Sequence, residues 1–291
     1  MANRKLTDIF VVPPISVLDI KQKYWKDRRK KWMALNIQSE LGRNENLLKL
    51  SELLQKKQKS TSIFDPVLCE IMYLWFSKIG DTIFDPFAGG SVRGIIASKM
   101  DRKYIGVDLR KEQVEHNYIQ SNDICNSNLP KWLIGSSAET TIDCKYDLFF
   151  TCPPYYDLEK YSDNEKDLSN MKVEDFDKEY ESIISLSLQN LKNNRFAIIV
   201  VGDVRGKNGN YLNFIQKTIN IFEKNGCNYY NDMILLQEPA TAAMRAFNYM
   251  NSSRKIAKAH QNVLVFIKGG AKKATNRMTK FIDNKMDTLF D

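Results

Sequence analysis

The chain has 291 residues, of which 43% are hydrophobic and 27% charged, ordinary values for a globular protein. Its longest strongly apolar runs are too short to cross a bilayer, and its first residues lack the apolar core of a signal peptide, so we expect a cytoplasmic protein without a membrane segment. The five cysteines are scattered without a C-x-x-C pair, and there are only two histidines. This pattern predicts a reducing compartment and no metal site.

The net charge of +8 is unevenly distributed along the chain. Residues 21–31 hold seven Lys or Arg and one Asp, and residues 239–282 hold nine Lys or Arg and no acid. Removing these +6 and +9 contributions leaves −7 on the remainder. An acidic body with two basic attachments favours a polyanion-binding protein over the alternative of two solvated basic faces.

The N-terminal part, residues 1–60, is expected to form a basic arm with helices. Residues 21–35 predict a basic helix that carries Trp25 and Trp32 on one face, because these lie seven residues apart. Residues 47–59 predict a second, lysine-rich helix.

An alternation of strands and helices begins near residue 63. The strands expected from short apolar runs are 82–87, 103–108, 132–135, 146–151, 196–201, 229–237 and 262–268. The helices expected between them are 93–100, 111–121, 173–191 and 211–225. This order predicts an α/β fold with a mostly parallel, seven-stranded sheet and helices on both faces.

The first motif, Phe84-Asp-Pro-Phe-Ala-Gly-Gly-Ser91, lies where a strand ends and a helix begins. Its paired glycines allow a ligand to approach the backbone closely, and Asp108 ends the next strand, where a ribose-binding carboxylate belongs. Neither a G-x-G-x-x-G pattern nor a P-loop is present. Because Asp85 repels phosphate and attracts a cation, the turn suits S-adenosylmethionine, which carries an ammonium and a sulfonium.

The second motif, Phe149-Phe-Thr-Cys-Pro-Pro-Tyr-Tyr-Asp157, follows the fourth predicted strand. Its prolines keep the carbonyl of Pro153 out of a helix ladder, and Tyr155 offers an aromatic face beside it. A proline-terminated strand capped by aromatic residues is the alternative reading of this motif alone.

Together the two motifs resemble those of the DNA amino-methyltransferases, which act on adenine N6 or cytosine N4. Four further segments carry the resemblance: Thr61-Ser-Ile-Phe-Asp-Pro66, Ile105-Gly-Val-Asp-Leu109, Leu133-Ile-Gly-Ser-Ser-Ala138 and Lys258-Ala-His-Gln-Asn-Val-Leu-Val-Phe-Ile-Lys268. The whole chain is similar to compact methylases of phages and mobile elements. The resemblance implies a class I (Rossmann-like) methyltransferase fold, with a catalytic domain at 61–270 and a basic, flexible tail at 271–291.

The resemblance also implies the site residues and a mechanism in which the target base is flipped out of the duplex. Cofactor-binding residues are expected at Phe64, Asp65, Asp85, Pro86, Phe87, Ala88, Gly89, Gly90, Asp108, Ser136 and Ser137. Catalytic residues are expected at Cys152, Pro153, Pro154 and Tyr155. Tyr155 is expected to stack on the base, and the Pro153 carbonyl to accept a hydrogen bond from its amine.

Cys152 departs from the family pattern, which has Asp, Asn or Ser at this place. A thiol is a weaker acceptor than any of these groups, so the Pro153 carbonyl is expected to carry more of the task. Cys is closest in size to Ser, which cytosine-N4 enzymes favour, and this gives a slight preference for cytosine N4. Cytosine-C5 chemistry is rejected, because its Pro-Cys-Gln pattern is absent.

DNA contacts are expected from the two basic segments. Residues 238–260 are long for a connection between neighbouring strands and mix cations with aromatic residues, as a DNA-contacting loop does. The expected DNA-binding residues are Lys26, Arg28, Arg29, Lys30, Arg245, Phe247, Asn248, Tyr249 and Arg254.

These features predict a site-specific methyltransferase of double-stranded DNA in a bacterial or phage-infected cell, with S-adenosylmethionine as cofactor. One alternative is a nucleic-acid-binding protein on a degenerate methyltransferase scaffold. Another is an enzyme that methylates RNA or a protein glutamine, since x-Pro-Pro-Tyr also occurs there. The sequence leaves open the recognition site, the oligomeric state and whether a cognate restriction endonuclease exists.

Overall fold

The computed structural model describes residues 5–38, 63–140, 142–156, 164–237, 240–278, 280, 281 and 290. The helix predicted at 47–59 lies outside the described residues. Among the helices described, none is both long and apolar enough to cross a membrane.

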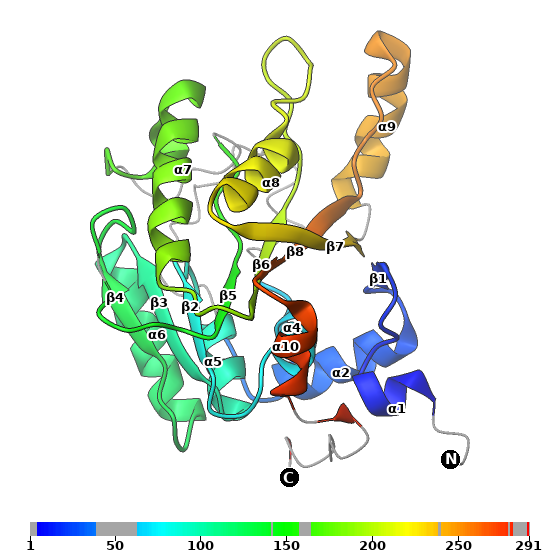
Figure 1. Cartoon of the computed structure of the whole chain (residues 1–291). Helices are drawn as coiled ribbons and strands as arrows, with labels where there is room; N and C mark the ends of the chain where they lie inside the picture. The colour runs from blue at the N-terminus through cyan, green and yellow to red at the C-terminus, as the bar shows by residue number, and fades with distance from the viewer. Residues whose placement is uncertain are drawn as a thin grey trace.

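Eight strands form one sheet in the order β1-β7-β8-β6-β5-β2-β3-β4 (Figure 1). The strands are β1 Val17–Asp19, β2 Thr82–Asp85, β3 Lys103–Asp108, β4 Lys131–Ile134, β5 Leu148–Thr151, β6 Arg195–Val201, β7 Cys227–Leu236 and β8 His260–Lys268. Of the pairs described, those that involve β8 are antiparallel and the others are parallel. The predicted α/β class with a mostly parallel sheet is therefore confirmed.

The prediction of seven strands is wrong by one. The additional strand, β1, pairs in parallel with β7, with Leu18 opposite Leu235. It is only three residues long, and a segment this short shows no alternation of apolar and polar residues from which a strand can be predicted.

Helices cover both faces of the sheet (Figure 1). They are α1 Leu6–Phe10, α2 Lys23–Met33, α4 Pro66–Phe76, α5 Val92–Lys99, α6 Lys111–Ile124, α7 Val173–Gln189, α8 Phe214–Lys224, α9 Ala240–Ser253 and α10 Ala271–Asn276, with a 3-10 turn at Leu168–Asn170. The apolar sides of α2, α4, α5 and α10 share one core cluster, and those of α7 and α8 share the cluster on the opposite face. The strongly apolar β6 lies between them with Phe196–Val201 buried, because each face of the strand meets a helix layer.

The predicted basic helix at 21–35 is confirmed as α2, and it packs against α4. Trp25 and Trp32 are buried on one face of α2, as their spacing indicated. Arg28 donates from Nε to both carboxylate oxygens of Glu70 at 2.9 Å, and Trp32 Nε1 donates to the same carboxylate at 2.6 Å. Glu70 is completely buried, so this charge-assisted cluster fixes α2 on the body of the protein.

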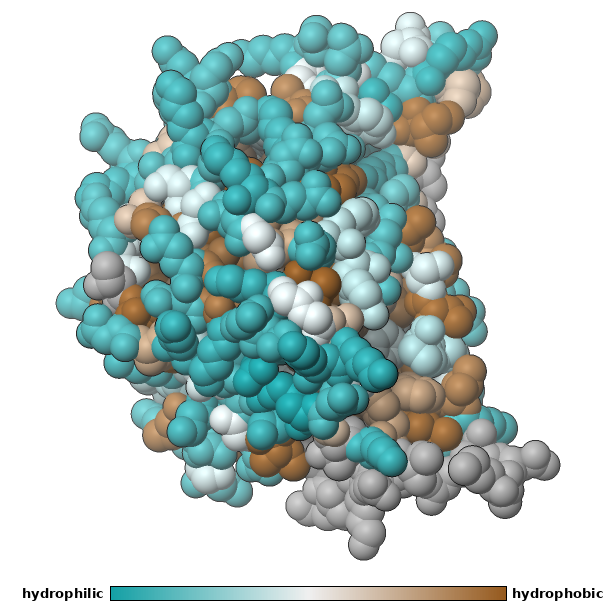
Figure 2. Space-filling model, in the orientation of Figure 1, coloured by the Kyte–Doolittle hydropathy of each residue, from teal (hydrophilic) through white to brown (hydrophobic). Residues whose placement is uncertain are grey.

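The segment predicted as a long loop at 238–260 contains a helix. α9 begins at Ala240 and ends at Ser253, and it projects from the ends of β7 and β8, at the upper right of Figure 1. Figure 2 shows apolar side chains on this projecting part, and Met244 and Phe247 are 67% and 75% exposed. The helix was missed because length between two strands indicates an insertion but not its conformation.

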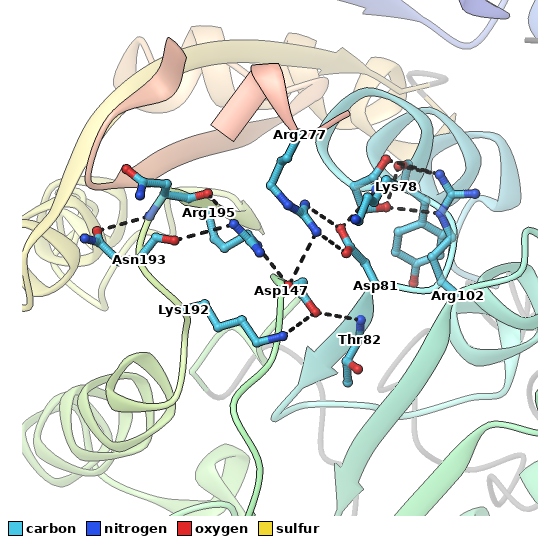
Figure 3. A network of polar contacts seen from close by, with 12 residues as sticks. Lys78, Asp81, Thr82, Arg102, Asp147, Lys192, Asn193, Arg195 and Arg277 are labelled. Carbon is cyan, nitrogen blue, oxygen red and sulfur yellow. Dashed lines mark hydrogen bonds and ion pairs between the residues drawn. The ribbon is translucent and has the colours of Figure 1, made fainter. Parts of the chain in front are cut away.

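At the amino ends of the strands, Asp147 holds a network of cations together (Figure 3). It forms ion pairs with Lys192 and Arg195, each at 2.9 Å. Arg277, which follows α10 in the tail expected at 271–291, approaches Asp147 at 3.6 Å and donates to Asp81 at 2.7 Å. This network joins β2, β5, β6 and the C-terminal segment at the amino ends of the strands, which is the end of the sheet opposite to the carboxyl ends.

Candidate functional site

The sheet reverses its strand order between β2 and β5, which are neighbours in space although β3 and β4 intervene in the sequence. In open α/β sheets, such a switch point is where ligands bind, beyond the carboxyl ends of the strands. A cavity of about 640 Å³ lies there, within the range of small-molecule sites. It is lined by residues that follow β2, β3, β4 and β5, by the start of α4, and by residues of the N-terminal segment.

The glycine turn after β2 is held in place by a buried ion pair. Asp85 is completely buried and accepts hydrogen bonds from Arg93 Nε at 2.5 Å, Tyr104 Oη at 2.7 Å and Thr151 Oγ1 at 2.5 Å. Arg93 also donates to the carbonyl oxygens of Phe87 and Ala88, at 2.6 and 2.8 Å. Burial alone lowers the pKa of Arg93, but the adjacent Asp85 carboxylate raises it, so the guanidinium stays charged.

The sequence suggested that Asp85 presents its negative charge to a bound ligand. The structure shows instead that this charge is paired with Arg93. Asp85 is not one of the residues that line the cavity. It lies beneath the cavity wall, where the positive charge of Arg93 offsets its negative charge. Its hydrogen bonds with Tyr104 and Thr151 link β2 to β3 and β5, below the turn that lines the cavity.

Asp108 and Gly89 meet at the tip of the turn. The Gly89 amide donates to Asp108 Oδ2 at 2.8 Å, and the Arg110 amide donates to Asp108 Oδ1 at 2.9 Å. Gly89 has φ +52°, a conformation that L side chains rarely adopt, so the turn requires glycine here. Burial raises the pKa of Asp108, although the two amide hydrogen bonds oppose this shift. A carboxylate offers about four acceptor positions, so Asp108 retains capacity toward a ligand in the cavity.

The loop after β4 closes the same side of the cavity. Ser136 and Ser137 line it beside Gly135. Ser137 Oγ donates to the carbonyl of Pro86, which ties this loop to the glycine turn.

Phe64 and Asp65 form the wall at the start of α4. Asp65 caps the helix by accepting from the amides of Val67 and Leu68, at 2.8 and 3.3 Å, and it also accepts from Trp25 Nε1 at 3.1 Å. Burial raises the pKa of Asp65, and Arg29 opposes this shift from 4.0 Å.

The Pro-Pro-Tyr segment forms the wall after β5. Cys152, Pro153, Pro154 and Tyr155 all line the cavity. The Tyr155 hydroxyl lies 3.5 Å from Cys152 Sγ and donates to the carbonyl of Val200 at 3.3 Å. The ring of Phe214 packs edge-on against Tyr155, with 6.2 Å between centroids.

Two glutamine side chains complete this wall. Gln261 Nε2 donates to Tyr155 Oη at 2.6 Å, and Gln237 Nε2 donates to Gln261 Oε1 at 2.7 Å. Gln237 follows β7 and Gln261 lies near the start of β8, so the pair joins the two ends of the insertion that contains α9. Both side chains line the cavity.

The structure brings together most of the site residues expected from the sequence. The cofactor set except Asp85, and all four catalytic residues, line one cavity. Sequence reasoning missed Arg93, Thr151, Gln237 and Gln261. Arg93 gave a signal, because it is a cation within an otherwise apolar helical run, but the glutamines gave none, because their partner is distant in the sequence.

The residues expected to bind DNA divide into four groups. Lys26 and Lys30 are exposed and line a shallow basic hollow on α2. Arg28 faces inward to Glu70, with its side chain 10% exposed, because the buried carboxylate needs a cationic partner. Arg29 lines both this hollow and the central cavity.

The fourth group lies on or just after α9, away from the cavity lining. Phe247, Asn248 and Arg254 are exposed, and the Arg245 guanidinium lies over the ring of Tyr249, 5.9 Å from its centroid. These side chains project beyond the carboxyl end of β7. The cavity also lies at the carboxyl ends of the parallel strands.

Known proteins share this fold and parts of this sequence. The structure resembles that of a Pyrococcus horikoshii protein described as an RNA methyltransferase, with a TM-score of 0.50 and 13% identity, over 84% of this chain and 100% of that one. This likeness confirms the class I methyltransferase fold.

Two curated relatives match shorter segments. The type II methyltransferase M2.DpnII of Streptococcus pneumoniae is 40% identical over 48 residues, and the orphan methyltransferase M.BamHII of Bacillus amyloliquefaciens is 36% identical over 73 residues. The matches cover 16% and 25% of this chain, and 18% and 24% of the respective relatives.

The DNA methylase family matches far more of the sequence, at residues 15–120 and 146–288. These ranges contain the glycine turn, Asp108 and the Pro-Pro-Tyr wall. The chain therefore belongs to the DNA methylase family.

Proposed function

We propose that this protein transfers a methyl group from S-adenosylmethionine to the exocyclic amine of a base in double-stranded DNA, with cytosine N4 as the favoured target. One observation carries the proposal: the glycine turn and the Pro-Pro-Tyr segment face one cavity from either side of the switch point between β2 and β5. Cofactor and target base thereby have adjoining places.

The cofactor side of the cavity consists of the glycine turn, Asp108, the loop after β4 and the start of α4. Asp108 accepts hydrogen bonds from the ribose hydroxyls, and Ser136 and Ser137 lie beside the adenine. Arg93 keeps the glycine turn in shape from below through its bonds to two carbonyls. When bound, the cofactor supplies a methyl group activated by a sulfonium centre.

The base side consists of Cys152, Pro153 and Tyr155. A target base reaches this wall only outside the duplex, because a stacked and paired amine cannot enter the cavity. Tyr155 stacks on the flipped base, and the Pro153 carbonyl accepts one N–H of its amine. Since the nitrogen lone pair is delocalised into the ring, fixing the hydrogens out of the ring plane makes it available for attack.

Cys152 supports the preference for cytosine N4. It lies at the cavity wall, where the family pattern carries an oxygen or amide acceptor, and its small side chain is closest in size to serine. The Sγ atom lies 3.5 Å from the Tyr155 hydroxyl, so the thiol also contacts the stacking residue.

The test is to incubate the purified protein with duplex DNA and S-adenosylmethionine, digest the DNA and identify modified nucleosides by mass spectrometry. We expect N4-methylcytosine from the wild type. We expect most of this product to be lost with Tyr155→Ala, whose affinity for S-adenosylhomocysteine stays near that of the wild type. Loss of base stacking costs about 1–3 kcal/mol, which calorimetry on cofactor alone does not detect.

N6-methyladenine in place of N4-methylcytosine would overturn the target base but retain amino-methylation. No modified nucleoside in DNA, with methyl groups incorporated into RNA under the same conditions, would overturn DNA as the substrate. If Tyr155→Ala loses cofactor affinity first, Tyr155 belongs to the cofactor side.

A further inference from the structure

Arg29 differs from the other cations of α2 in what it faces. Lys26 and Lys30 line the outer basic hollow, whereas Arg29 also lines the central cavity. Its side chain is 45% exposed, and the nearest carboxylate oxygen among the described residues is Asp65 Oδ2, 4.0 Å from Nε. At this distance the two groups attract one another but make no hydrogen bond, and within the described part of the chain the guanidinium has no other polar partner, so its N–H donors can reach a ligand in the cavity.

The position of Arg29 is fixed by the packing of α2. Trp25 lies one helical turn before it on the same face, is buried, and donates to the same Asp65 oxygen at 3.1 Å. Arg28 and Trp32 bind Glu70 one turn further along α4. The helix is therefore anchored on both sides of Arg29, and its guanidinium is held at the wall formed by Phe64 and Asp65.

Two anions are candidates for Arg29: a DNA phosphate from the outer hollow and a carboxylate from inside the cavity. A phosphate beside Arg29 also meets the negative charge of Asp65, which repels it. An α-amino acid carries its ammonium and its carboxylate on one carbon atom, so it offers a cation to Asp65 and an anion to Arg29 together. The pair of opposite charges at one cavity wall thus favours a zwitterion over a phosphate.

We infer that Arg29 binds the carboxylate of the methionine moiety of S-adenosylmethionine, so that the N-terminal helix α2 forms part of the cofactor site. This inference rests on the proposed function for the identity of the ligand. It assigns to the N-terminal segment a role beyond contact with DNA, and it divides α2 between Arg29 on the cofactor side and Lys26 and Lys30 on the DNA side.

The test compares two ligands by isothermal titration calorimetry without DNA. S-adenosylhomocysteine carries the ammonium and the carboxylate, and 5′-methylthioadenosine carries neither. Arg29→Ala should raise the dissociation constant for S-adenosylhomocysteine about tenfold and leave that for 5′-methylthioadenosine unchanged. Arg29→Lys should restore part of the loss, because it keeps the charge but not the bidentate geometry.

Lys30→Ala is the matched control on the same helix. It should leave both cofactor-analogue affinities unchanged and weaken DNA binding, measured by fluorescence anisotropy on a labelled duplex. Arg29→Ala should show the reverse pattern. Equal thermal midpoints of the wild type, Arg29→Ala and Lys30→Ala would exclude misfolding of α2 as the cause of any change in affinity.

Three outcomes would overturn the inference. Unchanged S-adenosylhomocysteine affinity with weakened DNA binding makes Arg29 a phosphate contact. Equal loss for both ligands means that Arg29 shapes the wall without binding the carboxylate. If neither ligand binds the wild type, the cofactor assignment fails as well. An Arg29-dependent affinity without any methylated base in DNA would instead overturn the proposed function and leave the role of Arg29 intact.

Discussion

Tyr155 is oriented by a directional chain of hydrogen bonds. Gln237 donates to Gln261, Gln261 donates to the Tyr155 hydroxyl, and Tyr155 donates to the Val200 carbonyl. Gln261 accepts through its amide oxygen and donates through its amide nitrogen, so the chain defines the position of the Tyr155 hydroxyl and, through it, of the ring. Such a network specifies a geometry more strongly than a single contact does.

We predict that Gln261→Leu lowers kcat for methyl transfer about tenfold, because loss of one hydrogen bond of about 1–1.5 kcal/mol misplaces Tyr155. Affinity for S-adenosylhomocysteine should stay near that of the wild type. In a Tyr155→Phe background the same substitution should cost less than about twofold, since the hydroxyl through which it acts is already gone.

The matched control is Gln216→Leu, which removes an exposed glutamine that donates to Asn220 at 2.8 Å on α8. It should leave kcat unchanged. Additive losses in the double variant would show that Gln261 acts independently of the Tyr155 hydroxyl.

Asp147 makes a pH-dependent contribution to stability. Burial raises its pKa, but hydrogen bonds from Lys192, Arg195 and the Thr82 amide outweigh this and lower the pKa below its usual value of 3.8. A carboxyl group whose pKa is lower in the folded state stabilises the fold above its unfolded-state pKa. This stabilisation is lost as the pH falls through the folded-state pKa.

We therefore predict that Asp147→Asn lowers the free energy of unfolding by about 1–3 kcal/mol at pH 7, and that the difference from the wild type shrinks as the pH drops below 3.8. Urea unfolding followed by circular dichroism from pH 7 to pH 3 measures both effects. Glu181→Gln, which breaks an exposed ion pair with Lys224, is the control and should change stability by less than about 1 kcal/mol. A difference independent of pH would show that shape and not charge is responsible.

At the scale of elements, α2 and α9 carry different side chains toward the DNA that we propose as substrate. α2 presents lysines around a basic hollow, which suits phosphate oxygens. α9 presents Arg245, Phe247 and Asn248 on a projecting helix, and Arg and Asn are the side chains that pair best with guanine and adenine edges. We therefore expect affinity to depend mainly on α2 and sequence choice on α9.

Replacing Lys26 and Lys30 with Ala should weaken binding to every duplex about equally and reduce the slope of log Kd against log salt by about 2, close to one counterion per contact. Arg245→Ala should instead change or relax the methylated sequence, as read by modification-sensitive sequencing of DNA from cells that express the variant. Lys224→Ala on α8 is the control cation and should alter neither. An unchanged methylated sequence in Arg245→Ala, with an altered one in the α2 variant, would reverse the two roles.

At the scale of the whole molecule, the cavity joins segments of the described chain that lie as far apart in the sequence as Ile20 and Gln261. A ligand that fills the cavity contacts the N-terminal segment, the start of α4 and the carboxyl ends of β2, β3, β4 and β5. It also contacts Gln237 and Gln261, which lie at the two ends of the insertion that contains α9. Ligand binding should therefore stabilise these parts as one cooperative unit.

We predict that S-adenosylhomocysteine at 100 times its Kd adds about 2.7 kcal/mol to the free energy of unfolding and raises Tm by about 4 °C. Circular dichroism and tryptophan fluorescence should give the same midpoint with and without ligand, because Trp25 and Trp32 are buried where α2 meets α4. A tryptophan transition that precedes the main one and does not respond to ligand would show that α2 unfolds separately from the site.

Local patterns predicted most elements because their signals lie within each segment. β6 is a continuous apolar run bounded by polar residues, and α2 has two tryptophans at helical spacing. β1 could not be predicted, since three residues acquire strand structure only by pairing with β7. α9 was predicted as a loop because the length of residues 238–260 indicates an insertion but not its conformation, and two of its large apolar side chains, Met244 and Phe247, remain exposed.

The sequence by itself determined the α/β class, the two motifs at the strand tips and the segregation of basic charge. These depend on glycine, proline and apolar spacing, which act over a few neighbouring residues. Only the tertiary structure decided that Asp85 is neutralised by Arg93, that Arg28 turns to Glu70 while Arg29 faces the cavity, and that two glutamines orient Tyr155. The reason is physical: the partner of a charged or polar side chain is set by which distant segments pack beside it, and the free energy of burying that side chain depends on the partner.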